Sequence, residues 1–414
     1  MLKAPKTVTA AKIFLKLQFA AVIISSMIMA TVVSGCERKD LYLRVNQAEI
    51  SIAIYDIQLE LLWQATWRAE LNYDWLAKYG YLGYPEKPEL VKGIIYDVDT
   101  IEHKRTSYFS IIFSSTGGRV SLKTRTTYNM MFYNFGTEWI SFQQDEDYEH
   151  YCATTRTSSQ TPWTRTKSES KDSEMPEGYK NYIDVNQPDV IYGIMTDDLY
   201  VSDDPEEYET EYSEDGAPIY IYKIDCVLDP YVFIYIFQFI VTNNYDENGQ
   251  IITGARGITV TGLSQGVEMF SRKTFKNTIS ITTEDIKEIQ HHTDILLPGE
   301  TEAFEGDIFA ARVLTWGLPD INPMEKTQKN ETVDVIDNNY IGIGLRLRNN
   351  YTYTITRDIT ELMHKRPTGG IITIMIDGST VPKEYLEKKP ETGGGGFNAT
   401  VQDWKNEVHA EITI

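Results

Sequence analysis

The chain has 414 residues, of which 60 are acidic and 39 basic, and its formal charge is −21. A chain this acidic repels phosphate backbones, so nucleic-acid binding would require a clustered basic surface. The nearest candidate, with Arg156, Arg165, Lys167 and Lys171, lies in a Ser/Thr-rich run with few apolar residues, which argues against a nucleic-acid partner. The length is sufficient for about two domains of ordinary size.

The N-terminus predicts a bacterial lipoprotein signal peptide. Four lysines precede or enter an apolar run that ends at residue 33, and Ser34, Gly35 and Cys36 follow it. Basic residues hold such a segment on the cytoplasmic side, the apolar run enters the bilayer, and small residues admit a peptidase before the cysteine. Cleavage would remove residues 1–35 and make Cys36 the lipid-attachment residue. An uncleaved transmembrane anchor is the alternative, but the 17 residues from 17 to 33 are short for spanning a bilayer.

Removal of the signal peptide leaves a more acidic mature chain, because four lysines and no acidic residue are lost and the formal charge moves from −21 to −25. An acyl anchor needs no protein core, so the chain after Cys36 can be a soluble domain on a tether. Cys152 and Cys226 are the cysteines that remain besides Cys36. In an oxidising compartment they could form a disulfide, or they could stay as two buried free thiols.

Hydrophobic residues in the first half of the mature chain recur with a period of two, which predicts β-strands. Residues 57–67 alternate apolar and polar side chains as a half-buried strand does. Residues 108–113 and 120–124 flank Gly117 and Gly118 and predict a hairpin, and residues 128–135 predict another strand.

Two polar segments of this half predict loops. Residues 153–178 are rich in Ser and Thr and predict a long mobile loop. The acidic run over residues 203–215 predicts a solvated loop, because it lacks the glycine and ligand spacing of a known calcium loop.

The second half contains an almost wholly apolar run over residues 231–241, which predicts a central strand buried on both faces. We place a domain boundary near Ile224, between an N-terminal domain of residues 36–224 and a C-terminal domain of residues 225–414. Further strands are predicted at residues 258–260, 279–282, 309–315, 371–376 and 408–414, with a hairpin of residues 340–348 and 351–356 around Asn349 and Asn350 and a short helix over residues 357–364. The pattern predicts an all-β chain of two antiparallel β-sandwich domains in series.

Two patterns resemble sites of chemistry but predict none. Residues 262–266 match the Gly-x-Ser-x-Gly nucleophile elbow around Ser264, yet the chain lacks the alternating helices of the parallel sheet that carries such an elbow. We interpret Ser264 as part of a glycine-lined strand end. His291 and His292 would point to opposite faces of a strand, so they would not bind one metal ion together. We therefore predict no catalytic residue, no metal and no cofactor.

Exposed aromatic residues indicate an alternative function, because sugar rings stack on the faces of Trp and Tyr. A carbohydrate site could lie among the aromatic residues clustered in the first domain, although several of them must fill its core. These residues are Trp63, Trp67, Trp75, Tyr79, Tyr81 and Tyr84.

Motifs near the start, middle and end of the mature chain resemble those of a known family. They are Cys36-Glu37-Arg38-Lys39-Asp40-Leu41, Asn134-Phe135-Gly136-Thr137-Glu138-Trp139, Gly394-Gly395-Gly396-Phe397-Asn398 and Val401-Gln402-Asp403-Trp404. The chain resembles the fimbrillin-like lipoproteins of Bacteroidetes, and more closely a branch of them classified as a domain of unknown function. The resemblance implies two transthyretin-like β-sandwich domains, export to the outer membrane, and a role in or near type V pili.

The resemblance also implies a mode of assembly. In pilins of that group a protease trims the first strand after a basic residue, and a terminal strand of a neighbouring subunit fills the groove. Arg44 and Arg68 are both candidates for such cleavage here, and retention of the lipid on Cys36, as in anchor subunits, is equally compatible.

Together these observations predict a non-enzymatic, lipid-anchored surface protein that is a structural or anchoring subunit of a pilus or adhesion assembly. Its expected partners are the membrane, through the lipid on Cys36, and other pilus subunits, through strand addition. The alternative is a glycan-binding surface lipoprotein.

Overall fold

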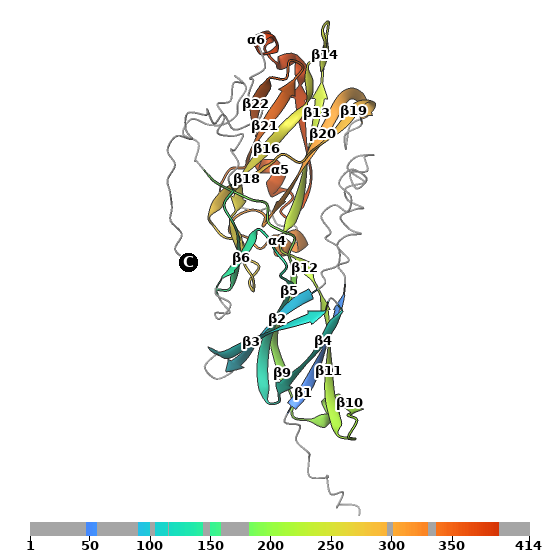
Figure 1. The fold of residues 1–414 in the computed structure, drawn as a ribbon. Helices are drawn as coiled ribbons and strands as arrows, with labels where there is room; N and C mark the ends of the chain where they lie inside the picture. Colours follow the sequence, from blue (N-terminus) through green and yellow to red (C-terminus); the bar gives the residue numbers. More distant parts are fainter. Residues whose placement is uncertain are drawn as a thin grey trace, which may run out of the picture. The chain divides into compact units, whose positions relative to one another are not determined.

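The computed structural model describes residues 47–55, 90–99, 104–114, 116–143, 150–158, 182–295, 301–329 and 337–388. Most of these residues form β-strands, which confirms the predicted all-β fold class (Figure 1). Within these ranges no helix has the length and hydropathy needed to cross a bilayer. The signal peptide, Cys36, the predicted strands at residues 57–67 and 408–414 and the aromatic cluster from Trp63 to Tyr84 lie outside the described residues.

The strands of the first half are short to medium in length. They are β1 Gln47–Tyr55, β2 Leu90–Asp99, β3 Lys104–Ser114, β4 Gly117–Lys123, β5 Thr126–Asn134, β6 Ile140–Gln143, β7 Cys152–Thr155, β8 Ile183–Val185, β9 Tyr192–Val201, β10 Glu209–Tyr212 and β11 Pro218–Val227.

The second half contains the longest strands and the short helices. The strands are β12 Asp229–Pro230, β13 Phe233–Thr242, β14 Tyr245–Asp246, β15 Gly249–Gln250, β16 Ile252–Ser264, β17 Gly266–Glu268, β18 Thr278–Thr283, β19 Ile286–Ile295, β20 Phe304–Thr315, β21 Tyr340–Leu347, β22 Thr352–Asp358 and β23 Gly369–Asp377. The helices of this half are α4 Pro323–Lys329, α5 Thr360–His364, η2 Gly378–Thr380 and α6 Lys383–Glu387, and η1 Pro205–Glu207 lies in the first half.

The chain divides into two compact units. The first consists of Met1–Ser51, Arg119–Thr126 and Tyr200–Lys223, and its strands are hydrogen-bonded in the order β10-β11-β1-β4. Its described buried aliphatic side chains are Val120, Leu122, Val201 and Ile221.

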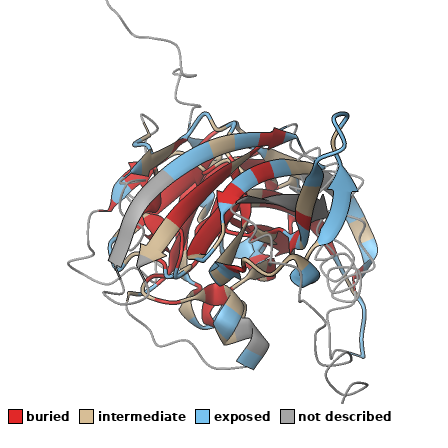
Figure 2. Ribbon diagram, turned by 90° about the horizontal axis from the view of Figure 1, so that it is seen from below, coloured by how far each residue is buried: buried red, intermediate tan, exposed pale blue. Residues whose placement is uncertain are grey.

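The second unit contains a β-sandwich. One layer is a four-stranded sheet in the order β19-β20-β13-β23, and the other is a five-stranded sheet in the order β22-β21-β16-β18-β8. Apolar side chains from both sheets form one buried core, with Phe237 and Phe309 from the first layer and Ile258 and Ile343 from the second. Figure 2 shows buried residues, in red, filling the interior of the strand layers, while exposed residues concentrate on hairpins and loops.

Strand β13 occupies the middle of the four-stranded sheet and is buried on both faces, as its sequence predicts. Tyr235 and Phe239 point into the core of the sandwich, whereas Ile234 and Ile240 belong to a second apolar cluster on the opposite face. That second cluster also contains side chains of β2, β5 and β7, so the four-stranded sheet is covered on both sides.

Several predicted elements are confirmed at nearly their expected bounds. The hairpin around Gly117 is formed by β3 and β4, in which Ser114 pairs with Gly117. Residues 128–134 of the predicted strand fall in β5, and the predicted hairpin of the second half is formed by β21 and β22. Asn350 in the turn of that hairpin has a φ of 61°, a conformation that Asn adopts more readily than most residues. The predicted helix over residues 357–364 is α5 at residues 360–364, whereas residues 357 and 358 end β22.

Two predicted loops contain strands. Cys152–Thr155 forms β7, which pairs with β6 on one side and β17 on the other, so the loop prediction is wrong for residues 153–155. Pairing on both sides satisfies the backbone polar groups of β7, and this long-range contribution is invisible in the composition of the segment. In the acidic run, Glu209–Tyr212 forms β10, which pairs with β11 as a fully exposed edge strand. Residues 159–181 lie outside the described part of the chain.

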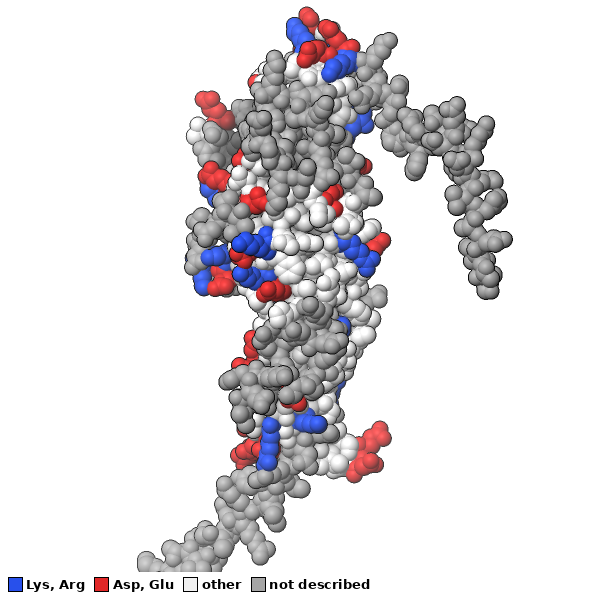
Figure 3. Space-filling view, turned by 90° about the vertical axis from the view of Figure 1, so that its left-hand side faces the viewer, with Lys and Arg blue, Asp and Glu red and all other residues white. Residues whose placement is uncertain are grey.

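Charged side chains are mixed in sign on the surface. On the face that Figure 3 shows, basic side chains lie in small groups beside acidic ones, with uncharged surface between them.

Candidate functional site

A cluster around Arg272 joins segments of the second unit that are far apart in sequence. The Arg272 guanidinium lies 3.0 Å from Oδ2 of Asp229 and donates a second hydrogen bond, also 3.0 Å long, to the carbonyl oxygen of Gly193. Its central carbon lies 4.9 Å from the centre of the Tyr231 ring, within the range of a cation–π interaction. We call this group, Arg272 with Asp229, Gly193 and Tyr231, the Arg272 clamp.

The partners of the clamp are themselves fixed by buried contacts. The Tyr231 hydroxyl donates to the carbonyl oxygen of Met269 at 2.6 Å, and burial raises the pKa of this phenol above its ordinary value, so the phenol stays a neutral donor. Gly193 has no room for a side chain, because an added Cβ would lie 2.8 Å from the Tyr231 ring. The absence of a side chain at Gly193 therefore allows the Tyr231 ring to pack against β9.

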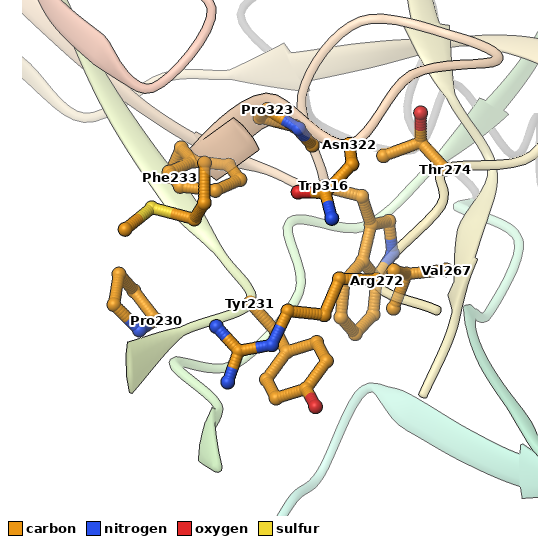
Figure 4. Close-up of a pocket in the computed structure, with 10 residues that line it drawn as sticks. Pro230, Tyr231, Phe233, Val267, Arg272, Thr274, Trp316, Asn322 and Pro323 are labelled. Atoms are coloured by element: carbon orange, nitrogen blue, oxygen red, sulfur yellow. The ribbon is translucent and has the colours of Figure 1, made fainter. Parts of the chain in front are cut away.

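Arg272 and Tyr231 line a shallow pocket beside Trp316 (Figure 4). Its volume of about 200 Å³, which includes space open to solvent, is below the usual range for a small-molecule site. The Trp316 indole N–H donates to the Thr155 hydroxyl at 2.7 Å, and Thr274 also makes buried hydrogen bonds within the protein. These contacts indicate that the polar side chains around the pocket hold the protein's own segments together rather than bind a ligand.

Open sheet edges are the second feature of functional interest, because an edge strand presents unpaired backbone groups to an incoming strand. Strand β8 has three residues, and the register of β19 against β20 is interrupted twice, so both of these edges are poorly suited to strand addition. Strand β22 has seven residues and ends in the charged pair Arg357 and Asp358.

Strand β23 is the longest regular edge of the sandwich among the described residues. It has nine residues, none of them charged before Asp377, and it pairs with β13 in parallel along its whole length. No described strand pairs with its other edge. Ile372, Ile374 and Ile376 point into the sandwich core, whereas Met375 is 42% exposed.

The structure places Ser264 where it cannot act as a nucleophile. It is completely buried at the end of β16, and its hydroxyl lies 2.8 Å from the carbonyl oxygen of Gly266 and 3.0 Å from that of Phe275. Gly262 has a φ of 72°, and an added Cβ would lie 2.5 Å from the carbonyl oxygen of Asn338. The motif is therefore a bend that glycine permits in a buried strand.

The histidine pair lies on β19, in the part of the sandwich near Asp307. His291 Nδ1 is 3.4 Å from the Asp307 carboxylate, and the His291 ring stands edge-on to Tyr245 with 5.5 Å between ring centres. Among the residues that the structure describes, no group of three or more His, Cys, Asp or Glu side chains is arranged to hold a metal ion.

The cysteines do not form the disulfide that the sequence permits. Cys152 and Cys226 are both free and buried. Cys152 belongs to the three-stranded sheet β17-β7-β6, whereas Cys226 lies in β11, which belongs to a different sheet. Burial raises the pKa of both thiols, that of Cys226 to about 12. They remain protonated and poorly reactive near neutral pH.

Sequence reasoning does not find the Arg272 clamp. Asp229 and Gly193 are separated from Arg272 by 43 and 79 residues, and neither belongs to a recognisable motif. Arg272 has a φ of 56°, an unusual backbone conformation, but the sequence gives no indication of it.

A family model described as "Domain of unknown function (DUF5119)" matches residues 62–282, more than half of the chain. The chain belongs to this family. Membership confirms the resemblance that the motifs indicated. A comparison with curated protein sequences finds no match.

Similar solved structures come from Bacteroidetes. One is of a protein from Bacteroides ovatus that is proposed to be an adhesin, with a TM-score of 0.45 and 17% identity, covering 86% of this chain and 98% of that one. A second is of the fimbrial anchor protein Mfa2 from Porphyromonas gingivalis, with a TM-score of 0.36, 7% identity and coverage of 80% and 90%. A third is of a Bacteroides thetaiotaomicron protein proposed to bind polysaccharide, with a TM-score of 0.34, 6% identity and coverage of 80% and 91%.

Proposed function

We propose that this chain is a lipid-anchored, non-enzymatic protein of the outer membrane surface that serves as a structural or anchoring subunit of a pilus or adhesion assembly. In this proposal acyl chains on Cys36 hold the protein at the membrane. In this proposal the mature body comprises two transthyretin-like β-sandwich domains in series, and β8 of the first half completes the second sandwich.

The observation that carries the proposal is the outer edge of β23. A regular edge of nine residues that is uncharged before Asp377 would promote aggregation in a monomer unless another strand covers it. The alternating apolar residues 408–414 of this chain, or a terminal strand of a neighbouring subunit, have the pattern to provide that strand. Strand addition gives affinity through backbone hydrogen bonds, and such contacts suit a polymer of repeated subunits.

The edge is tested by Met375→Lys, because lysine on an edge strand disfavours the addition of another strand. The control is Leu362→Lys on α5, since Leu362 and Met375 have nearly equal exposed fractions of 41% and 42%. We expect unboiled gels of membrane fractions to show ladders of subunits for the wild type and the control, and fewer ladders for Met375→Lys. Equal ladders in all three proteins would contradict a role for this edge in assembly.

Lipid attachment is tested separately by metabolic labelling with a palmitate analogue. We expect the wild-type protein to be labelled and to sediment with outer membranes, and Cys36→Ala to be unlabelled. Equal labelling of both proteins would show that Cys36 is not the acylated residue.

A second candidate function is glycan binding by the same surface lipoprotein. The observation that favours it is the group of tyrosines on β10 and β11, of which Tyr212 is the most exposed. Aromatic rings on a protein surface bind the apolar faces of sugars, and this candidate is compatible with a role in adhesion.

A further inference from the structure

The hairpin of β10 and β11 in the first unit gathers tyrosines on one of its faces. Thr210 pairs with Tyr220, and Tyr212 pairs with Pro218. Residues that pair across antiparallel strands share a face, and residues two apart on one strand do too. Tyr212, Tyr220 and Tyr222 therefore lie on the same face, which we call the tyrosine face.

Tyr208, just before β10, packs against the rings of this face. Its ring is inclined at 64° to that of Tyr220 and at 75° to that of Tyr222, with ring centres 6.2 and 6.4 Å apart. Its hydroxyl donates to the carbonyl oxygen of Ser202 at 2.6 Å. Burial, followed by the nearby Glu207 and Tyr200, raises the pKa of Tyr208 to about 12, so its phenol remains a neutral donor.

The rings of the face remain available to a ligand. The exposed fractions are 73% for Tyr212 and 39% for Tyr222, and the neighbouring Tyr200 is 57% exposed. Because Tyr208 holds Tyr222 from one side, little side-chain freedom is lost when a ligand stacks on it, which favours binding.

Ion pairs on the opposite face of the hairpin hold β10 in place against its neighbouring strands. Glu209 lies 2.6 Å from the ammonium of Lys223, and both carboxylate oxygens of Glu211 accept hydrogen bonds of 2.9 Å from Arg119. The bidentate geometry of the Arg119 pair gives it directional specificity that a single contact lacks.

The charge of this region limits what can bind to it. Residues 119–126 and 200–223 carry eight acidic side chains against four basic ones. An acid surplus of this size disfavours anionic polysaccharides and phospholipid headgroups. Besides the tyrosines, the face presents Thr210 and Pro218 and no exposed aliphatic side chain, so it offers little to the apolar core of a protein interface.

We propose that the tyrosine face binds neutral carbohydrate chains, with sugar rings stacked on Tyr212 and Tyr222. The C–H faces of the sugar contact the aromatic rings, while sugar hydroxyls accept from and donate to the phenol groups and the hydroxyl of Thr210. Tyr208 acts as a positioning residue that holds the rings. The proposal rests on the second candidate function above and assigns it a site and a ligand class.

The test uses affinity gel electrophoresis of the mature chain in gels containing mannan, dextran or laminarin as neutral probes and polygalacturonate as an anionic one. The test variants are Tyr212→Ala, Tyr222→Ala and their combination, with Tyr212→Phe as the conservative change. Tyr245→Ala is the control, because Tyr245 is 53% exposed on β14, outside this unit.

We expect at least one neutral polysaccharide to retard the wild type and the control. Each alanine variant should bind about 2- to 10-fold more weakly, the combination more weakly still, and Tyr212→Phe nearly as well as the wild type. Retardation that the combined variant retains would overturn the site while leaving glycan binding intact.

Three further results would overturn the inference. Binding of none of the neutral probes would remove both the inference and the second candidate function. Stronger retardation by polygalacturonate than by the neutral polysaccharides would refute the argument from charge. Binding of an immobilised basic protein that is lost in the combined variant, without glycan binding, would identify a protein ligand instead.

Discussion

Arg272 contacts three residues of the second unit that are distant from it in sequence. Its guanidinium donates hydrogen bonds to Asp229 and to the Gly193 carbonyl and lies over the Tyr231 ring. The planar, forked guanidinium of arginine can make these three contacts at once, whereas the ammonium of lysine cannot. We expect Arg272→Ala to lower the free energy of unfolding by about 2 kcal/mol, because it removes a charged hydrogen-bond pair and a cation–π contact. Arg272→Lys should recover only part of this loss. Urea unfolding followed by tryptophan fluorescence measures both.

The neighbouring Lys273 provides the control for Arg272. Its ammonium lies 2.6 Å from Asp320, and the side chains of Lys273 and Asp320 are 50% and 30% exposed. Surface pairs of this kind contribute about 0–1 kcal/mol, so Lys273→Ala should change the free energy of unfolding by less than Arg272→Ala does. Equal losses from the two substitutions would show that the clamp is no more important than a surface ion pair.

The buried thiols have a chemical signature that can be measured directly. Burial raises the pKa of Cys152 and Cys226, so the thiolate is scarce in the folded protein near neutral pH. In a Cys36→Ser variant we expect iodoacetamide at pH 8 to modify neither cysteine in the folded state and both in concentrated guanidinium. The thiol pKa is higher in the folded chain than in the unfolded chain. The stabilisation that the protonated thiols contribute is therefore complete below about pH 9 and is lost as pH rises toward the folded-state pKa. Rapid modification of either thiol in the folded protein would contradict their burial.

At the scale of elements, the start of β23 depends on glycine. Gly369 has a φ of 91° and pairs with Ile234, and an added Cβ would lie 2.2 Å from the Ile234 carbonyl oxygen. Gly369→Ala should therefore lower the free energy of unfolding by about 3 kcal/mol, the sum of backbone strain and a steric clash. Thermal and urea unfolding test this value.

Gly249, the first residue of β15, is the matched control for Gly369. Its φ of 102° is similar, but an added Cβ would meet nothing within 4 Å. Gly249→Ala should cost only the backbone strain, about 1 kcal/mol. If the two alanine variants were equally stable, close packing of β23 on β13 would not be the reason for Gly369.

The elements that sequence reasoning predicted well are those specified by local signals. The apolar run of β13 requires burial on both faces, and the structure provides it through β20 on one side, β23 on the other and two apolar clusters. Asn349 and Asn350 predicted the turn between β21 and β22 because Asn tolerates a positive φ. Periodicity and turn residues were sufficient in these cases.

The elements and contacts that sequence reasoning missed depend on distant partners. Strand β7 lies in a Ser/Thr-rich segment, and its position is fixed by pairing with β17 more than a hundred residues later. The acidic residues of β10 predicted a loop, but Glu209 and Glu211 are neutralised by Lys223 and Arg119. The Arg272 clamp likewise required three-dimensional proximity that no spacing rule encodes.

At the scale of the whole chain, strands from before and after the predicted boundary at Ile224 share sheets. Strand β8 is the edge of the five-stranded sheet through its parallel pairing with β18, and the buried Asp184 of β8 accepts hydrogen bonds from Ser280 and Thr282. The family match over residues 62–282 also crosses Ile224. The sandwich of the second half is therefore completed by residues of the first, and a fragment that begins at residue 225 would lack one of its strands.

The C-terminal segment decides between a subunit that closes its own sheet and one that donates a strand. Residues 408, 410, 412 and 414 are apolar and alternate with polar ones, which predicts a strand whose apolar face must be covered. If the segment covers a sheet edge of its own chain, deletion of residues 407–414 removes core contacts and lowers the melting temperature. If it serves a neighbour, the deletion spares the monomer and abolishes polymers.

We predict that this deletion destabilises the monomer, as expected for an anchor subunit. Substitutions on the two faces of the segment provide the control: Val408→Asp with Ile412→Asp should reproduce the effect, whereas His409→Asp with Thr413→Asp adds the same charge to the polar face and should have little effect. Differential scanning calorimetry of the mature protein measures stability, and unboiled gels of membrane fractions measure assembly. An unchanged melting temperature together with lost polymers would identify a stalk or donor subunit. In such a subunit the C-terminal strand completes a sheet of the neighbouring subunit, so the fold of its own chain does not depend on it.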